Sequence, residues 1–383
     1  MKKQDRKNQK VSLLELGVNK TVDHLTEQLG SWGVKPFRVK QIVRQIFQRG
    51  TLNFELMSDL PKDLLTRLAE SYELFPLLLT NKSFSRDKTS KLLWRTDDHS
   101  VFESVVIPME RGHRTVCVST QTGCALGCSF CATGRIGAGR NLTSGEILAQ
   151  TIHPVSEGRG GEIRDSESAG SDRSLNYVFM GMGEPLLNYD NLAAALRVMN
   201  HNEFMQVGAR RITVSTVGLP EQMIRFSTEF PQVKMALSLH AAEDGLRRRL
   251  MPIAKKVPLP ELLAACLECN KITGRRITLE YLVIPGINDR DVDVKALARI
   301  SKRLDCKINL IGYNPVEGLL FSKPTRQDLT QFRDRLFEKS KIAVNIRDSR
   351  GDDISGACGQ LAGGPRKPQK RRAVRSRGDK GKA

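Results

Sequence analysis

Acidic residues are scarce in this 383-residue sequence, where 42 Asp and Glu stand against 61 Lys and Arg and leave a formal net charge of +19 at pH 7. This balance is far from that of a typical soluble enzyme and indicates a polyanionic partner, for which nucleic acid is the first candidate. Long apolar runs are also missing: none approaches the roughly 18 to 20 residues of a spanning helix. Residues 1–5 lack the apolar core of a signal peptide. The sequence therefore predicts a cytoplasmic protein without a membrane segment.

Signals for a disulfide scaffold are absent as well. Eight cysteines in a long chain without a secretion signal are more often metal-binding or catalytic, because the cytosol keeps thiols reduced. Cys266 and Cys269 form a C-x2-C pair, but they lie in an apolar segment with helical periodicity. We interpret them, like Cys306, as buried small hydrophobes rather than a second metal site.

Three cysteines stand apart as a metal motif, Cys124, Cys128 and Cys131. Their C-x3-C-x2-C spacing supplies three thiolates to a four-iron cluster and leaves one iron open, whereas iron–sulfur clusters normally take a full set of cysteines. A metal with a vacant position can bind another molecule and do chemistry on it. The alternatives are three core cysteines or an incomplete zinc site, although zinc usually takes four ligands. The spacing resembles the radical S-adenosylmethionine (SAM) superfamily, whose open iron binds SAM and whose reduced cluster cleaves it to a 5′-deoxyadenosyl radical.

Residues 11–75 carry apolar positions three or four apart, which predicts a small helical domain. Basic side chains beside this apolar stripe suit either phosphate contact or a solvated face. The whole chain divides into a basic arm (1–10), a helical RNA-binding accessory domain (11–78), a β-rich extension (79–114, with strands at 91–95 and 101–107), a radical SAM core (115–361) and a basic tail (362–383).

From residue 115 onward, strand-like runs alternate with helical segments, which predicts an α/β fold with a parallel sheet or barrel. The six runs are Thr115–Ser119, Tyr177–Met180, Arg211–Ser215, Lys234–Leu239, Ile277–Ile284 and Lys307–Ile311. Six strands are too few for a closed eight-stranded barrel and match the partial (β/α)6 barrel that the superfamily resemblance implies. Residues 155–174 are polar and glycine-rich and are expected to form an exposed insertion.

Small polar or glycine-rich sequences follow four of these strands: Gly183-Glu184, Ser215, Ser238-Leu239-His240 and Asn314. Each alone is weak evidence, because serine, histidine and asparagine are common turn and cap residues. Reactive groups of β/α units lie at the C-terminal ends of the strands, however, so four such sequences behind a cluster motif predict a shared SAM pocket. Within it, Glu184 is suited to bind the SAM amino group.

Cys358 lies between small residues in a segment with loop character, and Cys117 lies just before the cluster motif. With these two thiols, residues 11–361 resemble the RlmN/Cfr family of radical SAM RNA methyltransferases. They are most similar to its RlmN branch, which methylates adenine C2 in 23S ribosomal RNA and in certain transfer RNAs. The resemblance implies a [4Fe-4S] cluster on Cys124, Cys128 and Cys131, and SAM contacts at Gly183, Glu184, Ser215, Ser238, Leu239, His240 and Asn314. It also makes Cys358 the methyl-carrying thiol, Cys117 the resolving thiol and Glu103 the proton acceptor.

The same resemblance implies two SAM molecules per turnover and an electron donor for the cluster. One alternative is a Cfr-type enzyme acting at adenine C8, against which the complete N-terminal helical domain argues. Another is a non-catalytic RNA-binding protein with a structural metal centre. Cys358 and the polar strand ends would have no purpose in such a protein. For Glu103 the alternative is a solvent-facing strand carboxylate.

Overall fold

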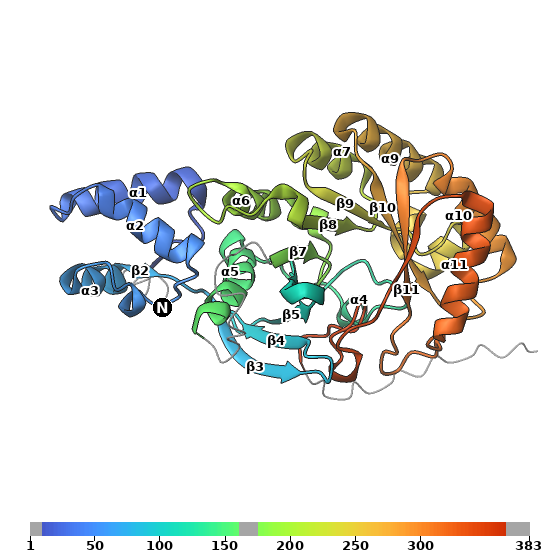
Figure 1. The fold of residues 1–383 in the computed structure, drawn as a ribbon, viewed down its shortest axis with the longest axis horizontal. Coiled ribbons are helices and arrows are strands. Elements are labelled where there is room, and N and C mark those ends of the chain that lie inside the picture. The colour runs from blue at the N-terminus through green and yellow to red at the C-terminus, as the bar shows by residue number, and fades with distance from the viewer. Residues whose placement is uncertain (1–9, 161–174, 365–383) are drawn as a thin grey trace, which may run out of the picture.

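The computed structural model describes residues 10–160 and 175–364, and most of them are arranged around one ten-stranded sheet (Figure 1). The strands follow the order β12-β11-β10-β9-β8-β7-β6-β5-β4-β3, so that each strand lies beside its neighbour in the sequence. Seven parallel strands form the barrel part: β6 (Arg114–Cys117), β7 (Leu175–Phe179), β8 (Ile212–Thr216), β9 (Lys234–Ser238), β10 (Ile277–Val283), β11 (Cys306–Gly312) and β12 (Val344–Arg347).

Helices connect these strands and cover the outside of the barrel (Figure 1). They are α4 (Ala132–Ile136), α5 (Ser144–Gly160), α6 (Tyr189–Asn200), α7 (Pro220–Glu229), α8 (Asp244–Leu250), α9 (Leu259–Thr273), α10 (Asp291–Ser301) and α11 (Arg326–Ser340). The predicted partial barrel is confirmed, and all six predicted strands are present. The seventh, β12, was not predicted, because its four residues Val-Asn-Ile-Arg are too short to show a periodicity.

Three antiparallel strands extend the same sheet: β3 (Leu78–Phe84), β4 (Ser90–Arg95) and β5 (Val101–Pro108), with β5 pairing to β6. The two strands expected in this segment are there. The sequence did not predict β3. It is an edge strand in which no residue is fully buried, and such a strand shows no alternation of apolar and polar residues. The extension therefore continues the barrel sheet rather than forming a separate layer.

The N-terminal part consists of α1 (Gly17–Ser31), α2 (Phe37–Val43) and α3 (Lys62–Ser71), with a short parallel pair of β1 (Val11–Ser12) and β2 (Tyr72–Glu73). These helices pack on the barrel through a continuous hydrophobic core. The ring of Phe47 lies 4.6 Å from that of Phe204, and the Gln48 side chain donates to the carbonyl of Glu203 at 3.0 Å.

The expected insertion at 155–174 is wrong for its first residues. Helix α5 continues through Pro154 to Gly160, and Val155 is buried against the N-terminal part, since a Cβ at Gly50 would lie 3.1 Å from it. Residues 161–174 lie outside the described residues, as do nearly all of the basic arm and tail. Within residues 10–160 and 175–364, no helix combines the length and apolar character needed to cross a bilayer.

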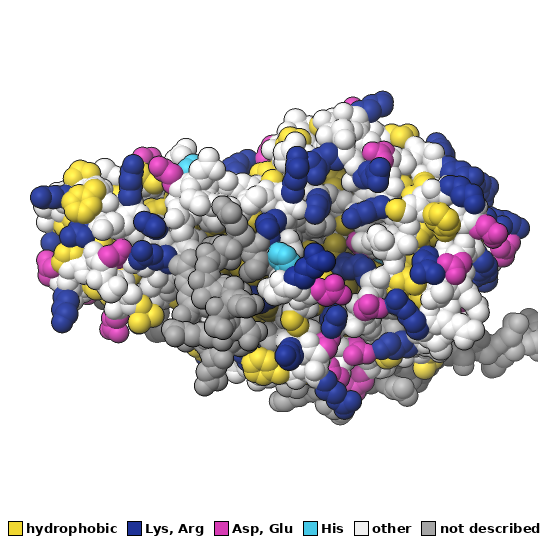
Figure 2. Space-filling view, viewed as in Figure 1, with side chains coloured by type: hydrophobic (Ala, Val, Ile, Leu, Met, Phe, Trp, Pro, Cys, Tyr) yellow, Lys and Arg dark blue, Asp and Glu magenta, His cyan; other side chains and the backbone are white. Residues whose placement is uncertain are grey.

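Lys and Arg side chains spread over both the N-terminal helices and the barrel on the face that Figure 2 shows, with fewer Asp and Glu among them. The positive charge of the sequence is thus distributed over the folded surface as well as the ends of the chain. Such a surface suits contact with an extended polyanion.

Candidate active site

The loop between β6 and α4 carries the three cysteines of the predicted cluster. Gly127 turns this loop with a φ of +63°, in the left-handed region that favours glycine. Gly134 lets the backbone of α4 approach the loop, because a Cβ there would lie 3.0 Å from the backbone nitrogen of Cys128. The short loop can therefore fold back on itself and bring its thiols together.

Two distant segments hold this loop in place. The Ser129 N–H donates to the carbonyl of Leu250 at 2.9 Å, which ties the loop to the end of α8. The Ala132 N–H donates to the carbonyl of Gly359 at 2.7 Å, and in Figure 1 the C-terminal segment passes beside α4. The second bond places Cys358, the neighbour of Gly359, next to the cluster loop.

The chemistry of the three thiols fits an iron–sulfur cluster. Cys124, Cys128 and Cys131 are all free, and cysteine thiolates are the usual ligands of such clusters. Burial raises the pKa of Cys128, and the neighbouring Cys131 and Cys124 add to this rise. Burial raises the pKa of Cys124 to about 11, so binding of iron would displace thiol protons.

Arg247 is a buried cation beside this loop that the sequence analysis missed. Its side chain is fully buried, and it donates to the carbonyls of Val217 at 2.6 Å and Leu239 at 3.3 Å. Its Nη1 has no hydrogen-bond partner among the described residues, while the guanidinium interacts electrostatically with Cys128. A buried cation with a free donor suits a site that will hold thiolates and a negatively charged cluster.

Glu184 follows β7 and is almost fully buried. Its two carboxylate oxygens accept backbone N–H groups of Leu186 at 3.2 Å and Val217 at 2.9 Å. Burial nevertheless raises the pKa of Glu184 to about 7, since no cation pairs with this carboxylate among the described residues. A buried carboxylate in this state is suited to accept a cationic group of a ligand.

The polar strand ends predicted to share a pocket lie at one edge of the sheet. The hydroxyls of Ser215 and Ser238, on neighbouring strands, are 3.2 Å apart. The Asn314 side chain donates to the carbonyl of Cys358 at 3.3 Å, and its buried Oδ1 has no partner in the described parts of the chain. An unpartnered buried oxygen at this position fits a ligand that supplies a donor.

His240 and Leu239 lie at the end of β9. The His240 ring contacts that of Phe130, in the cluster loop, edge to face at 5.0 Å, and its Nδ1 accepts the Leu282 N–H at 3.1 Å. Burial lowers the pKa of His240 to about 3, so the ring is neutral at physiological pH. Leu239 is fully buried, and its N–H and carbonyl are both hydrogen-bonded within the protein. The structure thus brings His240 to the cluster loop and leaves no free backbone group on Leu239.

Cys117 and Cys358 both lie at the ends of the cluster loop although the sequence separates them widely: Cys117 ends the strand before the loop, and Cys358 is the neighbour of Gly359, which is bonded to Ala132. Cys117 ends β6 and is buried, and burial raises its pKa to about 12. Cys358 is exposed to solvent, yet the surrounding protein still raises its pKa. Protein atoms thus crowd the Cys358 thiol without closing its path to solvent. Desolvation by the surrounding protein is the main cause of both raised pKa values, and neighbouring thiols add to it, Cys358 for Cys117 and Cys131 for Cys358.

Glu103 is not the solvent-facing carboxylate that was the alternative, because it is 2% exposed. Its carboxylate lies 3.1 Å from the ammonium of Lys91 and accepts the N–H groups of Ala362 at 2.8 Å and Gly363 at 3.2 Å. Glu103 therefore ties the segment that follows Cys358 to the β-sheet extension.

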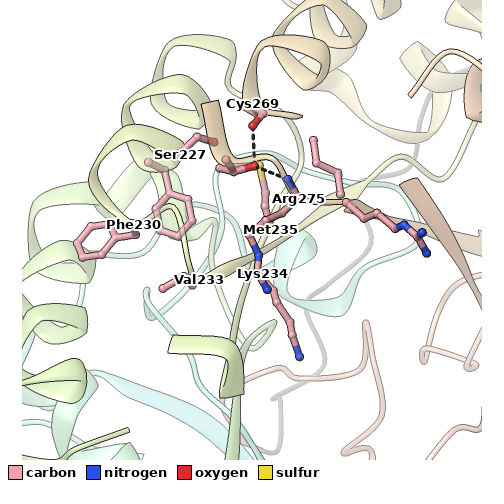
Figure 3. A pocket seen from close by; sticks show the side chains of 11 residues that line it. Ser227, Phe230, Val233, Lys234, Met235, Cys269 and Arg275 are labelled. Atoms are coloured by element: carbon pink, nitrogen blue, oxygen red, sulfur yellow. Dashed lines mark hydrogen bonds between the residues drawn. The ribbon is translucent and has the colours of Figure 1, made fainter. Parts of the chain in front are cut away.

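A small cavity lies at the opposite, N-terminal end of strands β9 and β10 (Figure 3). Its volume is about 20 Å³, and Ser227, Lys234, Cys269 and Arg275 are among its lining residues. A cavity of this size holds about one water molecule. The cavity is too small for a substrate and lies away from the predicted site.

Comparison with known proteins matches two parts of the chain to family models. Residues 118–298 match the radical SAM superfamily, and residues 16–74 match the ribosomal RNA large subunit methyltransferase N-terminal domain.

Similar full-length proteins cover nearly the whole chain. The dual-specificity RNA methyltransferase RlmN of Anaeromyxobacter dehalogenans is 43% identical over 354 residues, which are 92% of this chain and 93% of that protein. An RlmN of Myxococcus xanthus is 42% identical over 353 residues, which are 92% of this chain and 90% of that protein. The crystal structure of a radical SAM methyltransferase from Sphaerobacter thermophilus superimposes with a TM-score of 0.83 at 40% identity and covers 92% of this chain and all of that one.

Proposed function

Because this chain belongs to the RlmN family of radical SAM RNA methyltransferases, we propose that it methylates C2 of adenine in 23S ribosomal RNA and in transfer RNA. It is a SAM-dependent RNA methyltransferase that uses a [4Fe-4S] cluster and SAM. The observation that carries the finer proposal is the position of two free thiols at the cluster loop, because Cys117 ends the strand before the loop and Cys358 is the neighbour of Gly359, whose carbonyl accepts the N–H of Ala132. Two free thiols next to a cluster ligand suit a covalent carrier and a group that releases it.

The target atom explains why two thiols are needed. Adenine C2 has no lone pair with which to attack the SAM methyl group, so the methyl must first be placed on a protein nucleophile and then activated. When bound, the cluster supplies the electron that cleaves a second SAM and so generates the activating radical. Cys358, exposed and next to the cluster loop, takes the methyl group from the first SAM. The activated methyl carbon on the Cys358 sulfur then bonds to C2, which attaches Cys358 covalently to the RNA.

Release of the methylated RNA requires two further groups. The C2 proton must leave, and we assign its acceptance to Glu103, whose carboxylate is anchored to the backbone just after the Cys358 loop. The bond between the carbon and the Cys358 sulfur must then break. We assign to Cys117 the attack on that sulfur, which forms a disulfide with Cys358. The polar strand ends and Glu184 would bind SAM, and Cys124, Cys128 and Cys131 would hold the cluster.

The charge of the chain supports an RNA partner. A net charge of +19 provides a sequence-independent attraction to phosphates that is strongly salt-dependent. The cluster also needs an electron donor. Because the protein acts on RNA, we propose that it works in the cytoplasm.

The variant Cys117→Ala tests the two-thiol proposal. It leaves methyl transfer and attachment to RNA intact but removes the group that breaks the final bond. The RNA should then remain covalently bound to Cys358 and migrate with the protein on a denaturing gel. Cys269→Ala, which removes a buried cysteine in α9 far from the site, is the matched control and should show no crosslink.

A Cys117→Ala enzyme that has an intact cluster and turns over RNA without a crosslink would refute the role of Cys117. Mass spectrometric mapping of the methyl group in RNA treated with the wild-type enzyme separates methylation at C2 from methylation at C8.

A further inference from the structure

The loop that carries Cys358 lies against the strands of the β-sheet extension. This Cys358 loop, residues 351–361, follows β12, and in Figure 1 the C-terminal segment passes beside the end of β3. It contains a short helical turn, Asp352–Ile354, between Gly351 and Ser355, which have φ angles of +67° and +53°. A short irregular loop of this kind takes its position from the scaffold that binds it. The side chains that bind this loop therefore help to decide where the thiol lies.

Asp87, in the turn between β3 and β4, binds the start of the loop. Its Oδ2 accepts the N–H of Gly351 at 3.0 Å, while its Oδ1 accepts the N–H of Thr89 within the turn at 2.9 Å. Gly351 also packs closely on this turn, because a Cβ there would lie 2.9 Å from the side chain of Thr89. In the reverse direction, the Arg86 N–H donates to the carboxylate of Asp353 at 3.1 Å. Turn and loop thus hold each other through hydrogen bonds to ionised groups, which are stronger than those between neutral groups.

Lys91 of β4 binds the middle of the loop and the carboxylate behind its end. Its ammonium donates to the carbonyl of Ser355 at 3.4 Å and lies 3.1 Å from the Glu103 carboxylate. That carboxylate accepts the N–H groups of Ala362 and Gly363, the residues that directly follow the loop. Lys91 and Glu103 together therefore connect a point before the thiol with a point after it.

The pairing of β4 with β5 places this ion pair. Glu103 is opposite Leu93, and Lys91 lies two residues before Leu93 on the same face of β4. Diagonal neighbours of this kind are within reach of long side chains. The side chains of Lys91 and Glu103 are 16% and 3% exposed, so loss of the ammonium would leave a buried carboxylate without its cation. Removal of Lys91 is thus expected to disturb the loop that both residues hold.

Helix α4 binds the central part of the same loop. The Ala132 N–H donates to the carbonyl of Gly359 at 2.7 Å, and the Thr133 hydroxyl donates to the carbonyl of Leu361 at 2.7 Å. The contacts from the extension lie on both sides of these two bonds. The extension therefore holds the ends of the loop, while α4 holds its centre beside the cluster loop.

We propose that Asp87 and Lys91 are positioning residues, which hold the Cys358 loop so that its thiol meets the methyl group of SAM. This inference rests on the role proposed above for Cys358 as the methyl carrier. In that step the Cys358 proton leaves to solvent, the sulfur–methyl bond forms, and the bond between the methyl group and the SAM sulfonium breaks, which yields S-adenosylhomocysteine. Because the attacking sulfur must be close and in line, an error of about 1 Å in its position can slow the transfer about a hundredfold.

The first test is hydrogen–deuterium exchange of the cluster-loaded enzyme without SAM or RNA, measured by mass spectrometry on peptides that cover residues 351–363. Asp87→Ala removes the acceptor of the Gly351 N–H, and Lys91→Met removes the cation beside Glu103. A hydrogen bond to a charged group opposes local opening by about tenfold or more, so both variants should exchange at least about tenfold faster in this segment. Peptides from α9, on the outside of the barrel, should exchange as in wild type.

The second test is the transfer of the SAM methyl group to Cys358, in cluster-loaded enzyme whose mass has confirmed an unmodified thiol. Without RNA or reductant, the gain of a methyl group on the Cys358 peptide gives the rate. Asp87→Ala and Lys91→Met should be about tenfold to a hundredfold slower than wild type, while SAM affinity, measured by equilibrium dialysis, stays unchanged. Lys91→Arg keeps the cation and its donors and should retain most of the rate. A general loss of structure would lower rate and affinity together.

Two variants of the extension serve as matched controls. Lys82→Met breaks a partly buried ion pair between β3 and Glu157 of α5, and Asp97→Ala changes an exposed aspartate in the turn between β4 and β5. Both should behave as wild type in both tests.

Wild-type exchange of residues 351–363 in both Asp87→Ala and Lys91→Met would overturn the proposal, as would a loss of SAM affinity as large as the loss of rate. A Lys91→Arg enzyme as slow as Lys91→Met would also contradict it. If Lys91→Met fails to fold, Asp87→Ala decides alone, since it changes a partly exposed residue of a turn. If wild-type Cys358 itself gains no methyl group, the proposed function fails, and the exchange result still decides whether Asp87 and Lys91 hold the loop.

Discussion

Glu184 allows a quantitative prediction about how the stability of the cluster-free protein depends on pH. Burial raises its pKa from 4.5 to about 7, so the folded state binds a proton that the unfolded state has already lost. The stability that this proton contributes is fully present below pH 4.5 and is lost as the pH rises through 7. Between pH 5 and pH 8 this single group should therefore remove about 2.5 kcal/mol from the free energy of unfolding.

The variant Glu184→Gln isolates this contribution. Its amide cannot ionise, and it loses at most one of the two backbone hydrogen bonds of the carboxylate, a cost that does not change with pH. Relative to wild type, the variant should therefore gain about 2.5 kcal/mol of stability between pH 5 and pH 8, which is an increase in its relative free energy of unfolding. Urea unfolding of cluster-free protein at both pH values measures it. Glu221→Gln, which changes an exposed carboxylate at the start of α7, should show no such difference.

A relative stability of Glu184→Gln that is the same at both pH values would refute the reasoning, since it would mean that Glu184 is ionised in the folded protein throughout. The expected result would have a functional meaning. A carboxylate that is costly to ionise gains most when a cation binds beside it, as the SAM amino group would in the proposed pocket.

Two further predictions concern the positions of backbone and domain contacts. Gly183→Ala should lower SAM affinity at least tenfold, because Gly183 has a φ of +95° and a Cβ would lie 2.5 Å from the side chain of Gln121. Equilibrium dialysis with the cluster-loaded enzyme measures this affinity, and an equal loss in Gly208→Ala, where a Cβ meets open space, would contradict the prediction. Phe204→Ala should lower the free energy of unfolding by about 3 to 5 kcal/mol and make residues 10–74 sensitive to protease, because the fully buried Phe204 ring packs on Phe47. An unchanged midpoint of urea unfolding would show that the N-terminal helices dock by other contacts.

Several features of this protein were determined by the sequence over short distances. The cluster motif needs only eight consecutive residues, because three thiols in one short loop can reach one cluster wherever the loop lies. Six of the seven barrel strands could be predicted because each is a short apolar run between helical segments, and that pattern is local. Strand ends of parallel sheets share one edge, which is why Ser215 and Ser238 could be placed together.

Other features depended on the tertiary structure. The hydrogen bond between Ala132 and Gly359 brings Cys358, in the loop after the last barrel strand, to the cluster loop after the first strand, and only the family resemblance predicted that these regions come together. Spacing along the chain carries no information on such a contact. The burial of Glu103 was likewise decided by the C-terminal segment that covers it.

The buried charges show the same limit most clearly. An arginine in a helix, such as Arg247, is expected at the surface from sequence alone. Whether its charge faces water or a thiol depends on which layers pack over it and which strand pairs beside it. Arg247 is a case in point, because in the sequence it belongs to the basic run 247–249, yet the packing of α8 buries it and directs it to the carbonyls of Val217 and Leu239. The sequence by itself thus determined the chemistry that this protein carries, and the packing of the barrel decided which charges act on that chemistry.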